Sequence, residues 1–176
     1  ISKEGTTHTG NFGVPLSLAP GHYTVRYGSG SQKQQLHRTV QIREDYRTIV
    51  EPDYGGLQVE AVNLNGRPAE LAYEIFDADT GTSYGTGYTI ESVSEEERKT
   101  WILPTGRYKV TINNRPFSTG RDYTAVYVEK GKGNLLTISV TREEGETYRV
   151  VGGGAVKEPL YTPPDENWIL KSSIAG

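Results

Sequence analysis

The chain has 176 residues, of which 34% are hydrophobic and 23% charged, and its formal net charge is -3. Because no basic excess is available to neutralise phosphates, nucleic-acid binding is not expected. No apolar run reaches the ~18 residues of a membrane-spanning helix. The sequence also has no cysteine, which excludes disulfides, thiolate metal ligands and a cysteine nucleophile. Its 21 glycines and nine prolines disfavour long helices, whereas its many tyrosines favour strands.

Two segments of the chain follow one pattern, which indicates an internal repeat. Leu18–Val25 leads through a Pro/Gly turn into an alternating strand, and Leu103–Val110 does the same about 85 residues later. The residues expected to share a face of these strands are Tyr23, Val25 and Tyr27, and in the second copy Tyr108, Val110 and Ile112. The later strands are expected at Val40 and Ile42 and around Arg47–Val50, then at Val126 and Val128 and around Leu135–Val140. The repeat length suits a seven-strand sandwich of the immunoglobulin-like kind.

The second copy contains every expected element. It begins at Gly55-Gly56, and Asn65-Gly66 is a strong tight-hairpin signal because both residues accept a positive φ. Asp79-Thr80-Gly81 is expected to form another turn, and Ser94–Lys99 a solvated loop or a single helical turn. The inward-facing residues are expected to be Leu57, Val59, Ala61, Leu71, Tyr73 and Ile75, followed by a strand at Trp101–Leu103.

The first copy is incomplete. Ile1–Gly13 matches the second copy only from about Asp79 onward, so two opening strands are missing. An open sandwich exposes strand edges and core, so either the chain is cut inside a domain or other residues fill the gap. Thr147–Val151 and Trp168–Ile174 both have strand-forming patterns. We therefore hypothesise that the C-terminal tail, or a partner chain, supplies the missing strands.

These observations predict an all-β fold with two tandem immunoglobulin-like β-sandwich units. Residues 1–53 would form a partial unit that lacks its opening strands, and residues 54–142 a complete unit. Residues 143–176 would form an extended C-terminal tail that donates a strand or docks on a partner.

The complete unit resembles the carboxypeptidase-regulatory-like, or prealbumin-like, β-sandwich modules. The resemblance covers residues 55–141 well and residues 5–50 in part. It is carried by Gly55, Leu57, Val59, Ala61, Gly66, Pro68, Asp77 or Asp79, Thr80, Gly81, Leu103, Pro104, Gly106, Tyr108 and Val110. The first copy departs from the pattern with Leu-Ala-Pro-Gly at residues 18–21. Modules of this kind are parts of bacterial surface, periplasmic and von Willebrand A-type proteins, where they serve as spacers or interaction domains, so the resemblance implies an extracytoplasmic location.

No candidate for catalysis or a cofactor stands out from its simpler structural interpretation. The three histidines, His8, His22 and His37, have no paired-ligand spacing, so exposed strand and loop positions are favoured over a metal site. Asp77 and Asp79 could ligate calcium, but the further spaced ligands of a calcium loop are lacking, so an Asp-capped turn is favoured. A nucleophile elbow is absent, and the charged run within Ser94–Lys99 is typical of a solvated surface. The chain is therefore expected not to be an enzyme and to hold no metal or cofactor.

Two sets of apolar and aromatic residues remain as candidate binding sites. The tail carries Tyr161, Trp168, Ile169 and Leu170, which we expect to dock either on the chain itself or on a protein partner. Alternatively, Tyr84 and Tyr88, on either side of Gly85-Thr86-Gly87, could stack on a glycan or contact a peptide. The leading expectation is a structural or interaction module of a larger exported bacterial protein, acting as a spacer or assembly element, with strand exchange or homo-oligomerisation as a route to assembly.

Overall fold

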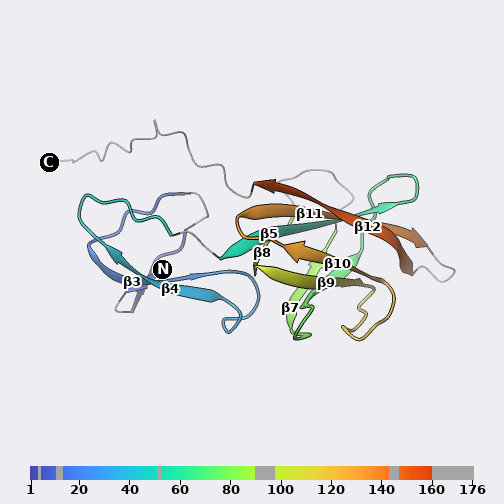
Figure 1. Cartoon of the computed structure of the whole chain (residues 1–176), viewed down its shortest axis with the longest axis horizontal. Helices are drawn as coiled ribbons and strands as arrows, with labels where there is room; N and C mark the ends of the chain where they lie inside the picture. The colour runs from blue at the N-terminus through green and yellow to red at the C-terminus, as the bar shows by residue number, and fades with distance from the viewer. Residues whose placement is uncertain (4, 11–13, 51–52, 90–97, 143–146, 160–176) are drawn as a thin grey trace.

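The computed structural model describes residues 1–3, 5–10, 14–50, 53–89, 98–142 and 147–159, and these residues confirm the predicted all-β class (Figure 1). The described strands form three sheets of four strands each. One sheet belongs to the first unit, and the other two belong to the second. None of the described residues lies in a helix that could cross a membrane.

The first unit is a single sheet with the strand order β2-β1-β3-β4. Its strands are β1 (Ser2–Lys3), β2 (Thr6–Thr7), β3 (Gly21–Tyr27) and β4 (Leu36–Ile42). β3 and β4 pair antiparallel along their whole length, from Gly21 opposite Ile42 to Tyr27 opposite Leu36. The described residues of the first unit form no second sheet, so in this part of the structure the unit is one layer.

The second unit has two sheets, with the strand orders β10-β9-β6-β7 and β12-β11-β5-β8. Its strands are β5 (Tyr54–Asn63), β6 (Ala72–Asp77), β7 (Ser83–Tyr88), β8 (Trp101–Pro104), β9 (Gly106–Ile112), β10 (Tyr123–Val128), β11 (Lys132–Arg142) and β12 (Tyr148–Pro159). Neighbouring strands pair antiparallel except β5 and β11, which run parallel. The arrangement is sandwich-like, because the two sheets enclose one core (Figure 1).

The core of the second unit consists of the alternating apolar residues that the sequence predicts. Both sheets contribute to one buried cluster, whose members include Leu57, Val59, Ala61, Leu71, Tyr73, Ile75, Trp101, Tyr108, Val110, Ile112, Val126, Val128, Leu136 and Ile138. Burying apolar area at about 25 cal/mol per Å² is the main stabilising contribution to such a unit. The polar residues between these positions face outward, as the period-2 pattern requires.

The two units share a construction, which supports the repeat read from the sequence. In the first sheet, β4, β3, β1 and β2 follow one another in the same way as β10, β9, β6 and β7 in the second unit. The hydroxyl of Tyr23 donates a hydrogen bond to the Ala19 carbonyl oxygen, and that of Tyr108 donates one to Pro104, each at 2.8 Å. Both tyrosines therefore hold the corner before their strand.

The predicted hairpin at Asn65-Gly66 is present, but its turn differs from the expected one. Only Gly66 has a positive φ, of 73°, and its N–H donates to the Asn63 carbonyl oxygen at 2.9 Å. The Asn63 side-chain oxygen also accepts the backbone N–H groups of Asn65 and Arg67. The loop therefore has three residues, with Gly66 in the left-handed position that follows a type I turn.

The strand predicted around Arg47–Val50 is wrong, since Tyr46–Val50 belongs to no strand. The equivalent part of the second unit is the start of β11, as shown by the positive φ of Asp45 (59°) and Gly131 (70°) in the preceding turns. β11 is held by β5 on one side and β12 on the other. Because the described first unit has no counterpart of β5 or β12, the backbone of 46–50 lacks a partner strand.

The strand predicted at Thr147–Val151 exists as part of β12, but its partner is not the first unit. β12 pairs antiparallel with β11, from Tyr148 opposite Arg142 to Pro159 opposite Lys132. The second unit thus continues to Pro159 rather than ending at residue 142. The hypothesis that this part of the tail fills the first unit is wrong, because β11 already supplies a complete partner edge.

Candidate functional site

The sheet of the first unit has one polar face and one apolar face. On the polar face, His22, Arg26, His37, Thr39 and Gln41 are exposed. The other face is mainly apolar and carries Tyr23, Val25 and Tyr27 from β3, with Leu36, Val40 and Ile42 from β4. Arg38, opposite Val25, is exposed on this same face, and Lys3 Nζ lies 5.6 Å from the centre of the Tyr23 ring. A sheet with this alternation normally packs its apolar face on another layer.

The apolar face of the first unit is covered less than its counterpart. In the second unit, Val110, Ile112 and Val128 are each 0% exposed because the opposite sheet lies over them. Their counterparts Val25, Tyr27 and Ile42 are only partly buried. In the adjoining segment, Tyr46 is 73% and Ile49 70% exposed. Tyr23 itself is buried, at 4% exposure. We define the partly buried Val25, Tyr27, Val40 and Ile42 as the open face, and this is the candidate functional site.

A hydrogen-bonded junction connects the hairpin between β3 and β4 to the second unit. The Ser29 N–H donates to the Ile102 carbonyl oxygen at 2.7 Å, and the Ile102 N–H donates to the Ser29 hydroxyl at 2.9 Å. Close by, the Gln34 side-chain amide donates to the Ser83 carbonyl oxygen at 2.9 Å. Ile102 lies in β8, an edge strand, so Ser29 satisfies backbone groups that β5 leaves free.

Aromatic packing and an ion pair reinforce the same end of the second unit. The rings of Tyr27 and Tyr54 lie 5.3 Å apart, and burial raises the pKa of Tyr54. Beside them, Lys130 Nζ is 2.6 Å from the Asp53 carboxylate and lowers the pKa of Asp53. These contacts extend the junction to the residues that connect the two units. The composition of the hairpin tip, Gly28-Ser29-Gly30-Ser31, gives no signal for its contact with β8.

The two tyrosines of the predicted glycan or peptide site have different surroundings. Tyr84 packs edge-on against Tyr108 at 5.6 Å, and burial raises the pKa of its phenol. The pairing of β6 and β7 shifts at this point, from Ile75 opposite Gly85 to Phe76 opposite Ser83, so Tyr84 occupies a bulge. Tyr88 is 68% exposed on the outer face of the sheet. The structure therefore does not bring the two rings together on one exposed surface.

The glycines between these tyrosines accommodate core aromatic rings. A Cβ at Gly87 would overlap the Tyr73 ring, and one at Gly85 would contact Trp101. The Trp101 indole N–H donates to the Tyr73 hydroxyl at 3.0 Å, and both side chains are buried. The Gly-rich segment therefore has a packing role in addition to any role at the surface.

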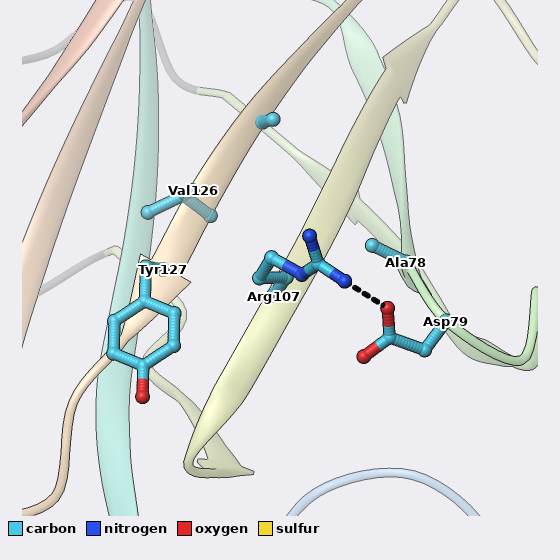
Figure 2. A pocket seen from close by; sticks show the side chains of 6 residues that line it. Ala78, Asp79, Arg107, Val126 and Tyr127 are labelled. Atoms are coloured by element: carbon cyan, nitrogen blue, oxygen red, sulfur yellow. Dashed lines mark hydrogen bonds and ion pairs between the residues drawn. The ribbon is translucent and has the colours of Figure 1, made fainter.

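A shallow depression of about 420 Å³ lies on the outer face of β9 and β10 (Figure 2). It is lined by Ala78, Asp79, Arg107, Ala125, Val126 and Tyr127. Arg107 is 2.6 Å from the Asp79 carboxylate across the depression, and both side chains are mostly exposed. Solvent-exposed ion pairs of this kind contribute little to stability, so the pair is available for contact with a ligand.

The remaining predicted positions are turns, exposed strand residues or undescribed residues. Asp77 accepts the backbone N–H groups of Asp79 and Thr80, which is the capped turn expected as the simpler interpretation. His22 and His37 are exposed on the polar face, and the described residues contain no group of three or more acidic or histidine side chains able to share a metal ion. Tyr161, Trp168, Ile169 and Leu170 lie outside the described residues.

The described residues thus form an all-β structure. One unit is sandwich-like, and the other is a single sheet with a partly covered apolar face. No protein-family model matches the chain, and neither a curated protein nor a solved structure matches it significantly. Functional proposals therefore depend on the chain's own sequence and geometry.

Proposed function

We propose that the chain is a non-catalytic structural and interaction module of a larger exported protein of the bacterial cell surface or envelope. The second unit is the rigid support, and the first unit is an incomplete immunoglobulin-like sandwich that accepts an added segment. The observation that carries this proposal is the contrast between the open face and its fully covered counterpart around Val110 and Val128. An apolar sheet face of this kind is a docking surface for another layer.

The exported location and the module class come from the resemblance to carboxypeptidase-regulatory-like β-sandwich modules. The residues that carry the resemblance include Leu57, Leu103 and Tyr108, which are buried, and Gly66 and Gly81, which adopt a positive φ in turns. These roles are structural, so they support a spacer and say nothing of chemistry. The shared order of strands in the two units supports tandem copies of one module.

A rigid spacer has to keep its two units at a fixed distance and orientation, and the hydrogen bonds of the junction would hold them there. Replacing Ser29 with alanine removes the acceptor of the Ile102 N–H, a hydrogen bond that contributes about 1 kcal/mol. We expect Ser29→Ala combined with Gln34→Ala to broaden the distribution of distances between spin labels placed by Thr39→Cys and Thr86→Cys. The chain has no native cysteine, so the labelling is specific.

The matched control for this experiment is Ser31→Ala, because Ser31 bonds Gln34 through its backbone N–H and carbonyl. That variant should keep the narrow distribution of the parent chain. A parent chain that already shows a broad distribution, unchanged by the double substitution, would exclude a rigid spacer.

A second candidate function is glycan or peptide binding on the outer face of the β10-β9-β6-β7 sheet. The observation that favours it is Tyr127, which is 49% exposed beside Arg107 and Asp79 in the depression, with Tyr88 exposed on the same face. An exposed tyrosine ring with charged neighbours suits stacking on a sugar. Of the two tyrosines that the sequence suggested for such a site, only Tyr88 would contact the ligand on this hypothesis, because Tyr84 packs against Tyr108.

A glycan array with the intact chain tests this second function. We expect Tyr127→Ala to weaken any binding about tenfold, equivalent to about 1.4 kcal/mol, through loss of the stacking surface. Tyr46→Ala, which removes a more exposed ring from the first unit, should leave binding unchanged. An array without signal would remove this candidate.

A further inference from the structure

The second unit shows what the open face lacks. Behind β9 and β10, the equivalents of β3 and β4, lie β11 and its parallel neighbour β5. The counterpart of the start of β11 in the first unit is Tyr46–Val50, which has the preceding turn but no partner strand among the residues that the structure describes. A single extended segment placed beside Tyr46–Val50 would provide backbone partners for it and would cover Val40 and Ile42.

The chain leaves the second unit at the end where this segment is needed. β12 ends at Pro159, opposite Lys132 at the start of β11. The adjoining Gly131 N–H donates to the Tyr54 carbonyl oxygen at 2.9 Å, and the Tyr54 ring contacts Tyr27 of the first unit. In Figure 1, β12 accordingly points from the far end of the second unit toward the side where β3 and β4 lie. Pro159 is therefore at the junction end.

The length of the remaining chain limits how far from Pro159 the candidate strand can begin. After Pro159 the sequence continues to Gly176, and the candidate strand Trp168–Ile174 begins after the residues 160–167. Those residues can span at most about 26–29 Å when extended, at about 3.3–3.6 Å per residue. A seven-residue strand such as β3 is about 23 Å long. Residues 160–167, when extended, are thus longer than a strand of the first sheet.

The pattern of the candidate strand fits a layer that covers an apolar face. In an extended conformation, Trp168, Leu170, Ser172 and Ile174 would share one side, which is mainly apolar, and Ile169, Lys171 and Ser173 would share the other. The apolar side would contact the open face, and the lysine would remain in water. A segment tethered by a short linker has an effective local concentration in the millimolar range, so the chain's own tail is favoured over a second copy.

We propose that Trp168–Ile174 of the same chain docks as an extended strand beside Tyr46–Val50 and covers the open face. The inference rests on the proposed function, in which the open face is a docking surface, and it names the occupant. With its own tail docked, the chain would cover its own open face and would act as a spacer without needing a second layer from a partner.

Thiol reactivity of the intact chain tests the proposal. Val40→Cys places a thiol on the open face, Thr39→Cys places one on the polar face of the same strand, and Val126→Cys places one at the covered counterpart of Val40. We expect the thiol at position 40 to be alkylated about tenfold more slowly than that at position 39. Ending the chain at Pro159 should remove this protection, and the thiol at position 126 should remain slow in both chains.

A pair of tail substitutions separates docking from a general effect of truncation. Leu170→Asp puts a charge on the docking side and should expose the thiol at position 40 as fully as the truncation does. Lys171→Asp changes the opposite side and should leave the protection intact. Equal effects of the two substitutions would contradict the proposed orientation.

The outcomes distinguish this inference from the proposed function. Protection that increases with protein concentration would overturn docking of the chain's own tail and assign the open face to a second copy, leaving the interaction module intact. A thiol at position 40 that reacts as fast as that at position 39 in every chain and at every concentration would overturn the inference. If no added partner domain of the parent protein slowed that reaction either, the proposed function would also fail.

Discussion

Replacing Trp101 with alanine should lower the free energy of unfolding of the second unit by about 3–5 kcal/mol. The Trp101 side chain is 2% exposed, packs edge-on against Tyr73 at 6.4 Å and donates a hydrogen bond to its hydroxyl. Its loss would leave a cavity behind β7, where Gly85 provides no side chain to fill the space. Denaturant unfolding followed by circular dichroism measures the change.

Trp101→Phe is the matched control, because it keeps an aromatic ring and removes the indole N–H. We expect it to cost about 1–3 kcal/mol, since the Tyr73 hydroxyl loses its partner in a buried site. The adjoining Ile102 holds Ser29, so the alanine variant should also weaken the junction. A loss of less than about 1 kcal/mol for Trp101→Ala would mean that the core is not packed as described.

Gly55→Ala should destabilise the second unit by about 3 kcal/mol, at the upper end of overpacking costs. A Cβ at this position would lie within 3.0 Å of the Glu129 and Lys132 carbonyl oxygens and of a Val128 methyl group. Two of these contacts are backbone atoms of the turn before β11, which cannot move without disturbing its pairing with β5. A thermal unfolding midpoint measured beside the parent chain gives the effect.

The control for this substitution is Gly120→Ala, at a glycine without a positive φ and with no atom within 4 Å of the added Cβ. Its expected change in stability is less than about 1 kcal/mol in either direction. If both alanine variants unfolded like the parent chain, the close approach of β5 to the turn before β11 would be disproved. Gly55 is also the first of the residues that carry the resemblance to carboxypeptidase-regulatory-like modules. The experiment therefore tests whether this glycine is needed for close packing of the strands.

Local signals in the sequence predict much of the fold. The Pro/Gly turns before Tyr23 and Tyr108 and the alternation after them are enough to place both strands and both corner tyrosines. Turn chemistry likewise places the hairpin at Asn65-Gly66 and the capped turn at Asp77. In these cases the residues that determine the conformation lie within a few positions of one another.

The errors arise where pairing with distant residues decides the structure. Arg47–Val50 has a strand pattern but no partner, whereas β12 is a strand despite Gly152-Gly153-Gly154, because β11 pairs with it. The strand pattern of the tail could not show which edge it joins. The bulge at Tyr84 adjoins Gly85, whose φ is 119°, and the packing of Tyr84 against the distant Tyr108 could not be predicted from that local signal.

The candidate site was predicted in outline but not in position. The missing strands of the first unit follow from the comparison of the two copies, and the open face is their structural consequence. The junction through Ser29 could not be predicted, because a Gly/Ser hairpin tip gives no sign of the strand edge that it contacts. Nor does exposure follow from residue type, since Tyr84 and Tyr88 differ only through the bulge between them.

Residue-level hydrogen exchange across Tyr46–Val50 in the intact chain tests the central claim most directly, that the first unit is completed by an added strand. Pairing with such a strand predicts that alternate amides of this segment exchange as slowly as those of β4. Ile49 and Val50 are adjacent and would differ in protection. Uniformly fast exchange through all five residues, alongside slow exchange in β9, β10 and β11, would contradict the account, because the open face would then have no layer over it.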